Sequence, residues 1–124
     1  MPSLKTTKVA IIGLGYVGLP LAVQISNCKK CFLTKEKLER EVIGFDVNSI
    51  RIENLKKGYD FTNELTKEIL NSDLPLKFTS DQKDLIEADI FIITVPTPVD
   101  NAKRPDFQFL KSASKIVGSA LSKR

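Results

Sequence analysis

Three glycines near the amino terminus have the spacing of a phosphate-binding turn. Gly13, Gly15 and Gly18 form the pattern Gly-x-Gly-x-x-Gly, which follows the apolar run Val9 to Ile12 and precedes a helical pattern of apolar residues. The first glycine permits a tight turn, the second lets a phosphate approach the backbone, and the third lets the helix pack closely on the strand. The start of that helix offers free N–H groups to an anion. The pattern therefore predicts a turn that binds the pyrophosphate of a dinucleotide.

An acidic residue at the end of the second apolar run is the next candidate. Asp46 closes the run that begins at Glu41, where a carboxylate can accept hydrogen bonds from an adenosine ribose and would repel a 2′-phosphate. This favours NAD over NADP; the alternative is that Asp46 only caps the next turn. Gly18 and Asp46 are 28 positions apart, whereas about 20 is usual. We attribute the difference to an insertion in the polar stretch 28–40.

Two further segments could contact such a cofactor. Arg51 lies one helical turn beyond Asp46, where it could cover the adenine or approach the phosphates; the alternative is an ordinary exposed helix arginine. Val95, Pro96 and Thr97 follow the most apolar run of the chain. They would lie at the carboxyl edge of a parallel sheet, where such sheets bind ligands. Thr97 would place a hydroxyl beside the crevice; the alternative is that the prolines only end the strand.

The elements that must position these residues alternate between strand and helix patterns. Strands are predicted at 8–13, 41–46, 76–79 and 89–95. Helices are predicted at 16–27 and after 105, and a further short helix is possible at 34–40. Three more helices are predicted together with their caps. One runs from a cap at 48 or 49 to a stop at 58, one covers 63–70 with a cap at 62, and one covers 81–88 with a cap at 80. The strand at 89–95 is apolar at nearly every position, which is typical of burial on both faces. The order predicts an α/β fold: the amino-terminal half of a Rossmann-like doubly wound parallel sheet, with helices on both faces.

Composition restricts the classes that remain. The 124 residues are enough for one domain, and 42% hydrophobic content suits a globular core. The net charge of +4 comes from lysines interleaved with acids, which indicates a solvated surface rather than a nucleic-acid site. No run is long enough to span a membrane and no signal peptide is recognisable, so a cytoplasmic location is expected. With no histidine, no His base or His metal ligand exists in this chain.

A pair of cysteines carries a weaker signal. Cys28 and Cys31 form Cys-x-x-Cys, but no second pair is present and no strand directly precedes them. Packed or loop thiols are the favoured interpretation, with a disulfide and a metal site as alternatives. No metal and no catalytic residue is assigned in this chain.

Taken together, these segments resemble one family. The stretches from Val9 to Ala22, Val42 to Asp46 with Arg51, Leu55 to Glu64, Ala88 to Pro98, and Pro105 to Phe107 are similar to the NAD-binding domain of the nucleotide-sugar 6-dehydrogenases, that is, the UDP-glucose, UDP-N-acetylhexosamine and GDP-mannose enzymes. The segments Gly58 to Glu64 and Val95 to Asp100 look more like the UDP-N-acetylhexosamine branch, which includes enzymes of Vi-type polysaccharide synthesis.

The resemblance implies roles for individual residues. Tyr16 and Val17 would meet the pyrophosphate through the turn backbone. Asp46 would hold the adenosine ribose, Arg51 would flank the adenosine, and Thr97 would lie on the nicotinamide side. The cofactor implied is NAD.

The resemblance also implies a reaction that this chain alone does not perform. The family oxidises the C6 alcohol of a nucleotide sugar to a carboxylate with two NAD, in the service of surface polysaccharide synthesis. Its catalytic cysteine, lysine and asparagine come from regions that would follow residue 124. Residues 1–124 are therefore expected to be one NAD-binding domain of a longer enzyme, which would bind its UDP-sugar through further domains and form a homodimer or larger assembly.

Two alternatives remain open at this point. One is the amino-terminal domain of a hydroxyacid or hydroxyacyl-CoA dehydrogenase, which shares the glycine motif. The other is a stand-alone nucleotide-sensing module without catalysis. The reading frame beyond Arg124 would separate them.

Overall fold

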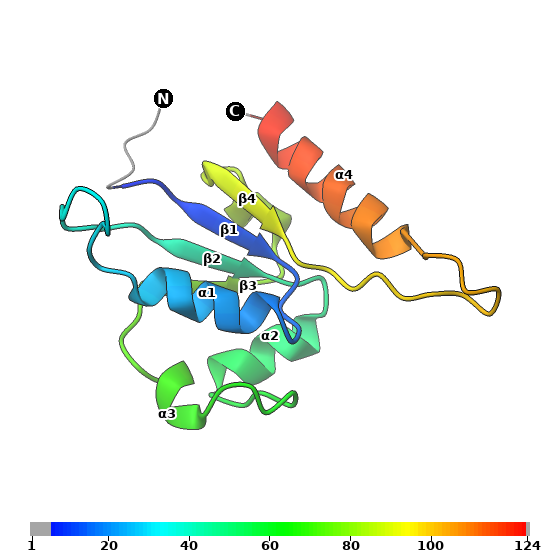
Figure 1. Cartoon of the computed structure of the whole chain (residues 1–124), viewed down its shortest axis with the longest axis horizontal. Helices are drawn as coiled ribbons and strands as arrows, with labels where there is room; N and C mark the ends of the chain where they lie inside the picture. Colours follow the sequence, from blue (N-terminus) through cyan, green and yellow to red (C-terminus); the bar gives the residue numbers. More distant parts are fainter. Residues whose placement is uncertain (1–5, 124) are drawn as a thin grey trace.

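The computed structural model describes residues 6–123, which form a parallel sheet with helices on both faces (Figure 1). The strands are β1 (Val9–Ile12), β2 (Val42–Phe45), β3 (Leu76–Thr79) and β4 (Ile90–Ile93). Their order is β3-β2-β1-β4, and each neighbouring pair is parallel. The chain moves from β1 outward to β3 and then crosses to the other side of β1. This reversal of strand order confirms the prediction that the chain forms one half of a doubly wound parallel sheet.

The helices divide between the two faces of the sheet. They are α1 (Gly18–Asn27), α2 (Ser49–Lys56), α3 (Lys67–Leu70), the 3₁₀ turn η1 (Gln82–Leu85) and α4 (Gln108–Ser122). Side chains from α1 and α2 belong to the core on one face, and side chains from η1 and α4 belong to the core on the other.

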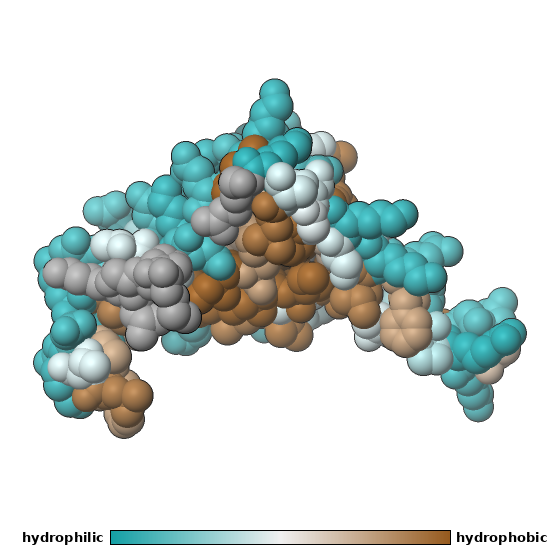
Figure 2. Space-filling view, turned by 90° about the horizontal axis from the view of Figure 1, so that it is seen from above, coloured by the Kyte–Doolittle hydropathy of each residue, from teal (hydrophilic) through white to brown (hydrophobic). Residues whose placement is uncertain are grey.

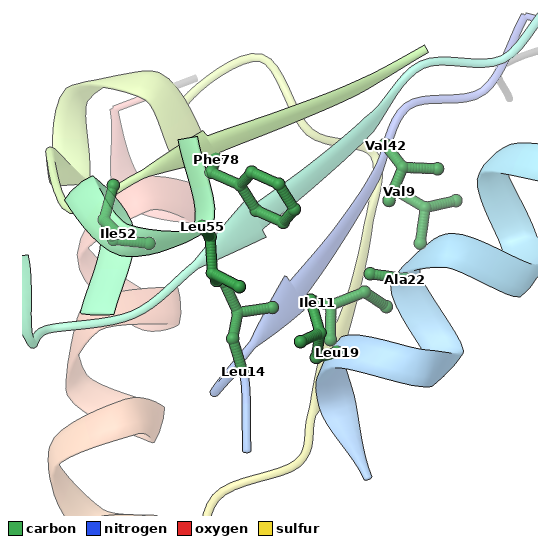
Figure 3. Close-up of a cluster of buried hydrophobic side chains, with 9 residues drawn as sticks. All are labelled: Val9, Ile11, Leu14, Leu19, Ala22, Val42, Ile52, Leu55 and Phe78. Carbon is green, nitrogen blue, oxygen red and sulfur yellow. The ribbon is translucent and has the colours of Figure 1, made fainter. Parts of the chain in front are cut away.

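The central strand supplies both cores. Val9 and Ile11 point to the face of α1 and α2, where they meet the side chains drawn in Figure 3. Ala10 and Ile12 point to the opposite face, toward η1 and α4. All four are buried, because successive side chains of a strand alternate between faces and both faces here are covered. The glycine turn that follows β1 is thereby fixed to the middle of the sheet.

Two of the predicted helix boundaries are confirmed. The side chain of Asn48 accepts hydrogen bonds from the N–H groups of Ile50 and Arg51 at 3.1 and 3.2 Å, which caps α2. Gly58 follows the end of α2 with a φ of +85°, a conformation that suits glycine.

Three predictions about the connecting segments are wrong. The segment 34–40 contains no helix, because Lys35 takes a positive φ of 63° and the chain folds back on itself. The helix expected at 63–70 is confined to Lys67–Leu70 and is capped by Thr66 instead of Thr62. The helix expected at 81–88 is the short 3₁₀ turn η1, capped by Asp81 instead of Ser80.

The last strand also differs from its prediction. β4 is apolar throughout but is not buried on both faces, and Ile90 is 42% exposed. It lies at the edge of the sheet, where no strand within residues 6–123 pairs with its outer side. On the predicted apolar stripe of α4, Ala113 is buried and Val117 half-buried, whereas Phe107, Leu110 and Leu121 are exposed. Within the described part of the chain, no helix has the length and apolar character needed to cross a bilayer.

Candidate functional site

The site lies at the carboxyl ends of β1, β2 and β4, where the strand order reverses. A pocket of about 440 Å³ opens there, within the usual range for small-molecule sites. Its lining residues come from the glycine turn, the ends of the three strands, the helices α2 and α4, and the segment that follows α2: Ile12, Gly13, Leu14, Gly15, Phe45, Asp46, Val47, Asn48, Arg51, Phe61, Thr94, Val95, Pro96, Phe109, Ser112, Ala113 and Ile116.

Each glycine of the turn has a different steric environment. Gly13 has a φ of +100°, and a Cβ there would lie 3.0 Å from the carbonyl oxygen of Thr94. A Cβ on Gly15 would meet no heavy atom within 4 Å, so this residue faces open space. A Cβ on Gly18 would collide with the carbonyl oxygen of Gly13 and the hydroxyl of Thr94. The turn therefore leaves room for a ligand at Gly15 and packs tightly at its other two glycines.

The amino terminus of α1 begins beside this open position. No side chain among the described residues caps the helix, and its first turn carries no acidic residue. The N–H of Leu19 bonds to the carbonyl oxygen of Gly15 and that of Leu21 to Val17. The helix start thus has its positive dipole end next to the accessible backbone of Gly15, an arrangement that favours an anion.

Asp46 is held by the backbone on both of its carboxylate oxygens. Oδ2 accepts the N–H of Leu14 at 3.0 Å, and Oδ1 accepts the N–H of Asn48 at 2.9 Å. The first bond ties the end of β2 to the glycine turn, and the second shapes the approach to α2. Each oxygen can accept a further bond, and the side chain is half-buried at the pocket wall. Asp46 therefore does shape the next turn, as the alternative interpretation expected, and its contact with a ribose stays a prediction.

Arg51 is not the exposed helix arginine of the alternative interpretation. Only 3% of its side chain is exposed, and its Nε and Nη2 donate to the carbonyl oxygen of Leu14 at 3.0 and 2.7 Å. Its Nη1 donates to Asp60 at 2.8 Å. The guanidinium carbon lies 4.5 Å from the centre of the Phe61 ring. Arg51 thus joins the glycine turn to the segment that follows α2.

Asp60 completes this buried pair. Its side chain is fully buried, and its carboxylate also accepts hydrogen bonds from the hydroxyl and N–H of Thr62 and the N–H groups of Glu64 and Leu65. Burial alone would raise the pKa of Asp60. The hydrogen bonds from Thr62, Arg51 and the backbone outweigh burial and lower its pKa to about 2. These bonds also explain why residues 62–65 form a turn around Asp60 instead of a helix.

The predicted site residues are only partly brought together. Gly13, Gly15, Asp46, Arg51, Val95 and Pro96 line the pocket, whereas Tyr16, Val17, Gly18 and Thr97 do not. Tyr16, Val17 and Thr97 are exposed, and Gly18 is buried beneath the turn. The contacts with a cofactor stay predictions for all ten residues, those that line the pocket included.

Sequence reasoning assigned no individual role to Thr94, Asp60, Phe61 or Phe109. The Thr94 hydroxyl donates to the carbonyl oxygen of Gly13 at 2.7 Å, which joins β4 to the glycine turn. The sequence feature that could have indicated a role for Thr94 is its position as a polar residue at the end of an apolar strand. Phe61 and Phe109 reach the pocket from distant parts of the sequence, which no local pattern reveals.

The two cysteines are remote from this site. Cys28 and Cys31 are free thiols in the connection between α1 and β2, at the opposite end of the strands from the pocket. Hydrogen bonds from the side chain and the backbone N–H of Thr34 lower the pKa of the Cys31 thiol. Within residues 6–123 no group of three or more possible metal ligands is present.

The chain is similar in sequence to one family of known proteins. Residues 7–124 match the NAD binding domain of the UDP-glucose/GDP-mannose dehydrogenase family. The chain is 45% identical over 123 residues to a UDP-N-acetyl-D-glucosamine 6-dehydrogenase of Salmonella typhi, which covers 99% of the chain and 26% of that protein. It is 43% identical over 114 residues to Protein CapL of Staphylococcus aureus, with 92% and 24% coverage. The chain thus spans about a quarter of the length of these relatives.

Solved structures agree with the sequence comparison. A UDP-D-ManNAc dehydrogenase from Pyrococcus horikoshii matches with a TM-score of 0.76 at 28% identity, over 93% of this chain and 26% of that one. A GDP-mannose dehydrogenase from Pseudomonas aeruginosa matches with a TM-score of 0.76 at 25% identity, over 94% and 26%. The family match over residues 7–124 decides against the hydroxyacid or hydroxyacyl-CoA dehydrogenase alternative.

Proposed function

The chain belongs to the UDP-glucose/GDP-mannose dehydrogenase family as its NAD-binding domain, and we propose that it holds NAD for the oxidation of the C6 alcohol of a UDP-sugar to a carboxylate. The substrate class that we propose is a UDP-N-acetylhexosamine, supported by the 45% identity to the UDP-N-acetyl-D-glucosamine 6-dehydrogenase of Salmonella typhi. The observation that carries the proposal is the pocket at the carboxyl edge of the sheet, in which an open Gly15 and the carboxylate of Asp46 face the same space.

The residues present fit a dinucleotide. The turn backbone at Gly15, Tyr16 and Val17 would donate to the pyrophosphate, since nothing blocks the approach to Gly15. Asp46 has acceptor capacity left for the two hydroxyls of an adenosine ribose. Val95 and Pro96 would form the wall that leads to Thr97 on the nicotinamide side. When bound, NAD supplies the hydride acceptor; the chain supplies binding and orientation.

Arg51 would act on the cofactor through the turn. Three of its N–H donors are already used on Leu14 and Asp60, so a direct hydrogen bond to adenosine would have to use the remaining ones. Arg51 would fix the position of the Leu14 carbonyl group and thereby the position of the glycine turn relative to the sheet.

We further propose that residues 1–124 are one domain of a longer enzyme. The open edge of β4 and the exposed apolar side chains of α4 would be covered by further parts of the sheet. The UDP-sugar and the catalytic groups would then come from outside this chain. The chain alone is expected to reduce no NAD with any UDP-sugar, and measurable formation of NADH would contradict this.

Cofactor preference tests the central assignment. Calorimetric titration should show that Asp46→Ser weakens NAD binding more than NADP binding, because the lost carboxylate serves the ribose hydroxyls and repels a 2′-phosphate. Asp73→Ser, at an exposed aspartate in the turn before β3, is the matched control and should leave both affinities unchanged. Equal losses of NAD and NADP affinity would refute the ribose assignment.

A further inference from the structure

The connection between α1 and β2 is longer than the fold requires. Links of about two to six residues suffice between a helix and the next strand, whereas this one runs over residues 28–41. We name residues 28–40 the basic hairpin, because the chain folds back through an antiparallel bridge between Lys30 and Lys37. A segment of this length with an ordered structure of its own is commonly functional.

The basic hairpin is held by its own hydrogen bonds. The N–H of Leu38 bonds to the carbonyl oxygen of Lys29 at 2.8 Å, and the N–H of Cys31 to that of Glu36 at 2.8 Å. The N–H of Lys35 closes the tip on the carbonyl oxygen of Cys31 at 2.9 Å. Leu38 is buried and anchors the base of the hairpin. The tip is therefore presented in a defined shape.

The tip displays two apolar side chains to solvent. Phe32 and Leu33 are each 85% exposed, more than any other large apolar residue that the structure describes. In Figure 2 apolar atoms lie at the end of the projection on the left, the position of this segment in Figure 1. Neither side chain contributes to the two hydrophobic cores. The packing of the fold therefore does not explain why these two positions are apolar.

Basic side chains surround this tip. Residues 28–40 contain five Lys or Arg against two Glu, which gives the hairpin +3 of the +4 of the whole chain. Lys35 places its ammonium nitrogen 5.1 Å from the centre of the Phe32 ring. Cationic groups and exposed apolar groups thus share one small projection.

We propose that the basic hairpin docks on an anionic membrane surface, with Phe32 and Leu33 entering the headgroup boundary and the lysines facing lipid phosphates. Apolar side chains flanked by Lys or Arg are the combination that binds such an interface. A stable protein partner usually needs about 1,200–2,000 Å² of total buried surface, which suits a narrow projecting tip less well. The hairpin joins the start of β2, away from the pocket at the carboxyl ends, so the proposal does not depend on the proposed function.

Vesicle sedimentation with the whole chain tests this proposal. We expect binding to phosphatidylcholine vesicles that contain phosphatidylglycerol, and at least about tenfold weaker binding to phosphatidylcholine alone, since each lysine near an anionic surface contributes about fivefold. Phe32→Ser/Leu33→Ser should lower the partition coefficient by about tenfold or more. Lys29→Gln/Lys30→Gln should do the same, and high salt should weaken the wild-type binding.

Matched variants separate the hairpin from other exposed groups. Phe107→Ser/Leu121→Ser removes two apolar side chains, one at the N-cap and one in the last turn of α4, that are each 49% exposed. Lys111→Gln/Lys115→Gln removes two exposed lysines of α4. Both should bind within about twofold of wild type, with circular dichroism confirming the fold of every variant. Absence of binding to the anionic vesicles would overturn the proposal and leave a protein partner for the hairpin. Equal losses in the hairpin and α4 variants would also overturn it.

Discussion

Replacement of Asp60 by asparagine should destabilise the fold because it leaves a buried arginine without its counter-ion. Asp60 is fully buried and Arg51 is 3% exposed, and their 2.8 Å contact is one of several that Asp60 accepts. Asparagine keeps one acceptor oxygen but places an NH₂ group against the other donors. Removal of one partner of a buried ion pair costs about 3–5 kcal/mol. We expect Asp60→Asn to lower the free energy of unfolding by about 3 kcal/mol, from a total of about 5–15 kcal/mol for an ordinary domain.

The pH dependence of this effect has a definite sign. The pKa of Asp60 is about 2 in the folded chain and 3.8 in its unperturbed state. A carboxyl whose pKa is depressed by folding stabilises the folded state above its unfolded pKa and loses that contribution as the pH falls through the folded pKa. The shift corresponds to about 2 kcal/mol. The difference in unfolding free energy between wild type and Asp60→Asn should therefore narrow as the pH falls from about 5 to about 2.

Urea unfolding followed by circular dichroism measures both quantities. Asp100→Asn is the control: its carboxylate also accepts backbone N–H bonds and pairs with Arg104, but the side chain is about half exposed. It should cost much less, because solvent screens and replaces its interactions. A loss below about 1 kcal/mol for Asp60→Asn, or a difference that stays constant with pH, would refute the argument that this pair is a buried, folded-state interaction.

Two further pairs of variants test the glycine turn. Gly18→Ala should lower the unfolding free energy by at least about 2 kcal/mol in the same urea assay, because the added methyl would overlap the carbonyl oxygen of Gly13. Gly15→Ala, which meets no atom, should unfold like wild type yet lose roughly tenfold in NAD affinity by calorimetry; an unstable Gly15→Ala would contradict the steric reasoning. Thr94→Val should cost about 1 kcal/mol through the lost bond to Gly13, and Thr94→Ser should restore most of it.

The sequence predicted those parts of the fold that follow from local patterns. The glycine turn, the strands and the parallel doubly wound order each rest on apolar runs punctuated by Gly, Asn or Pro, and all are present. The connecting segments were less predictable. Thr62, read as a helix cap, instead donates to Asp60, and the turn around Asp60 displaces the start of α3 to Lys67. A carboxylate that accepts hydrogen bonds from several backbone N–H groups competes with helix formation. The helix propensities of the individual residues do not include this effect.

The burial of β4 was mispredicted for a different reason. A run of apolar residues predicts that a strand is buried on both faces, whereas β4 lies at a sheet edge with Ile90 exposed. The pattern of apolar residues in a strand indicates that its side chains are suited to burial. It does not indicate which strand or helix would cover them. The same reasoning applies to Phe107 and Leu121 on α4, whose apolar character is not matched by burial within residues 6–123.

The buried pair of Arg51 and Asp60 explains why two distant segments of the sequence belong together. Arg51 donates twice to Leu14 in the glycine turn, and Asp60 organises the turn that brings Phe61 to the pocket. The position of the glycine turn therefore depends on a carboxylate 46 positions away from Leu14. Because a buried charge without its partner is costly, neither side chain can be exchanged singly without disturbing the turn. This coupling predicts that Asp60→Asn weakens NAD binding as well as stability, although Asp60 itself does not line the pocket.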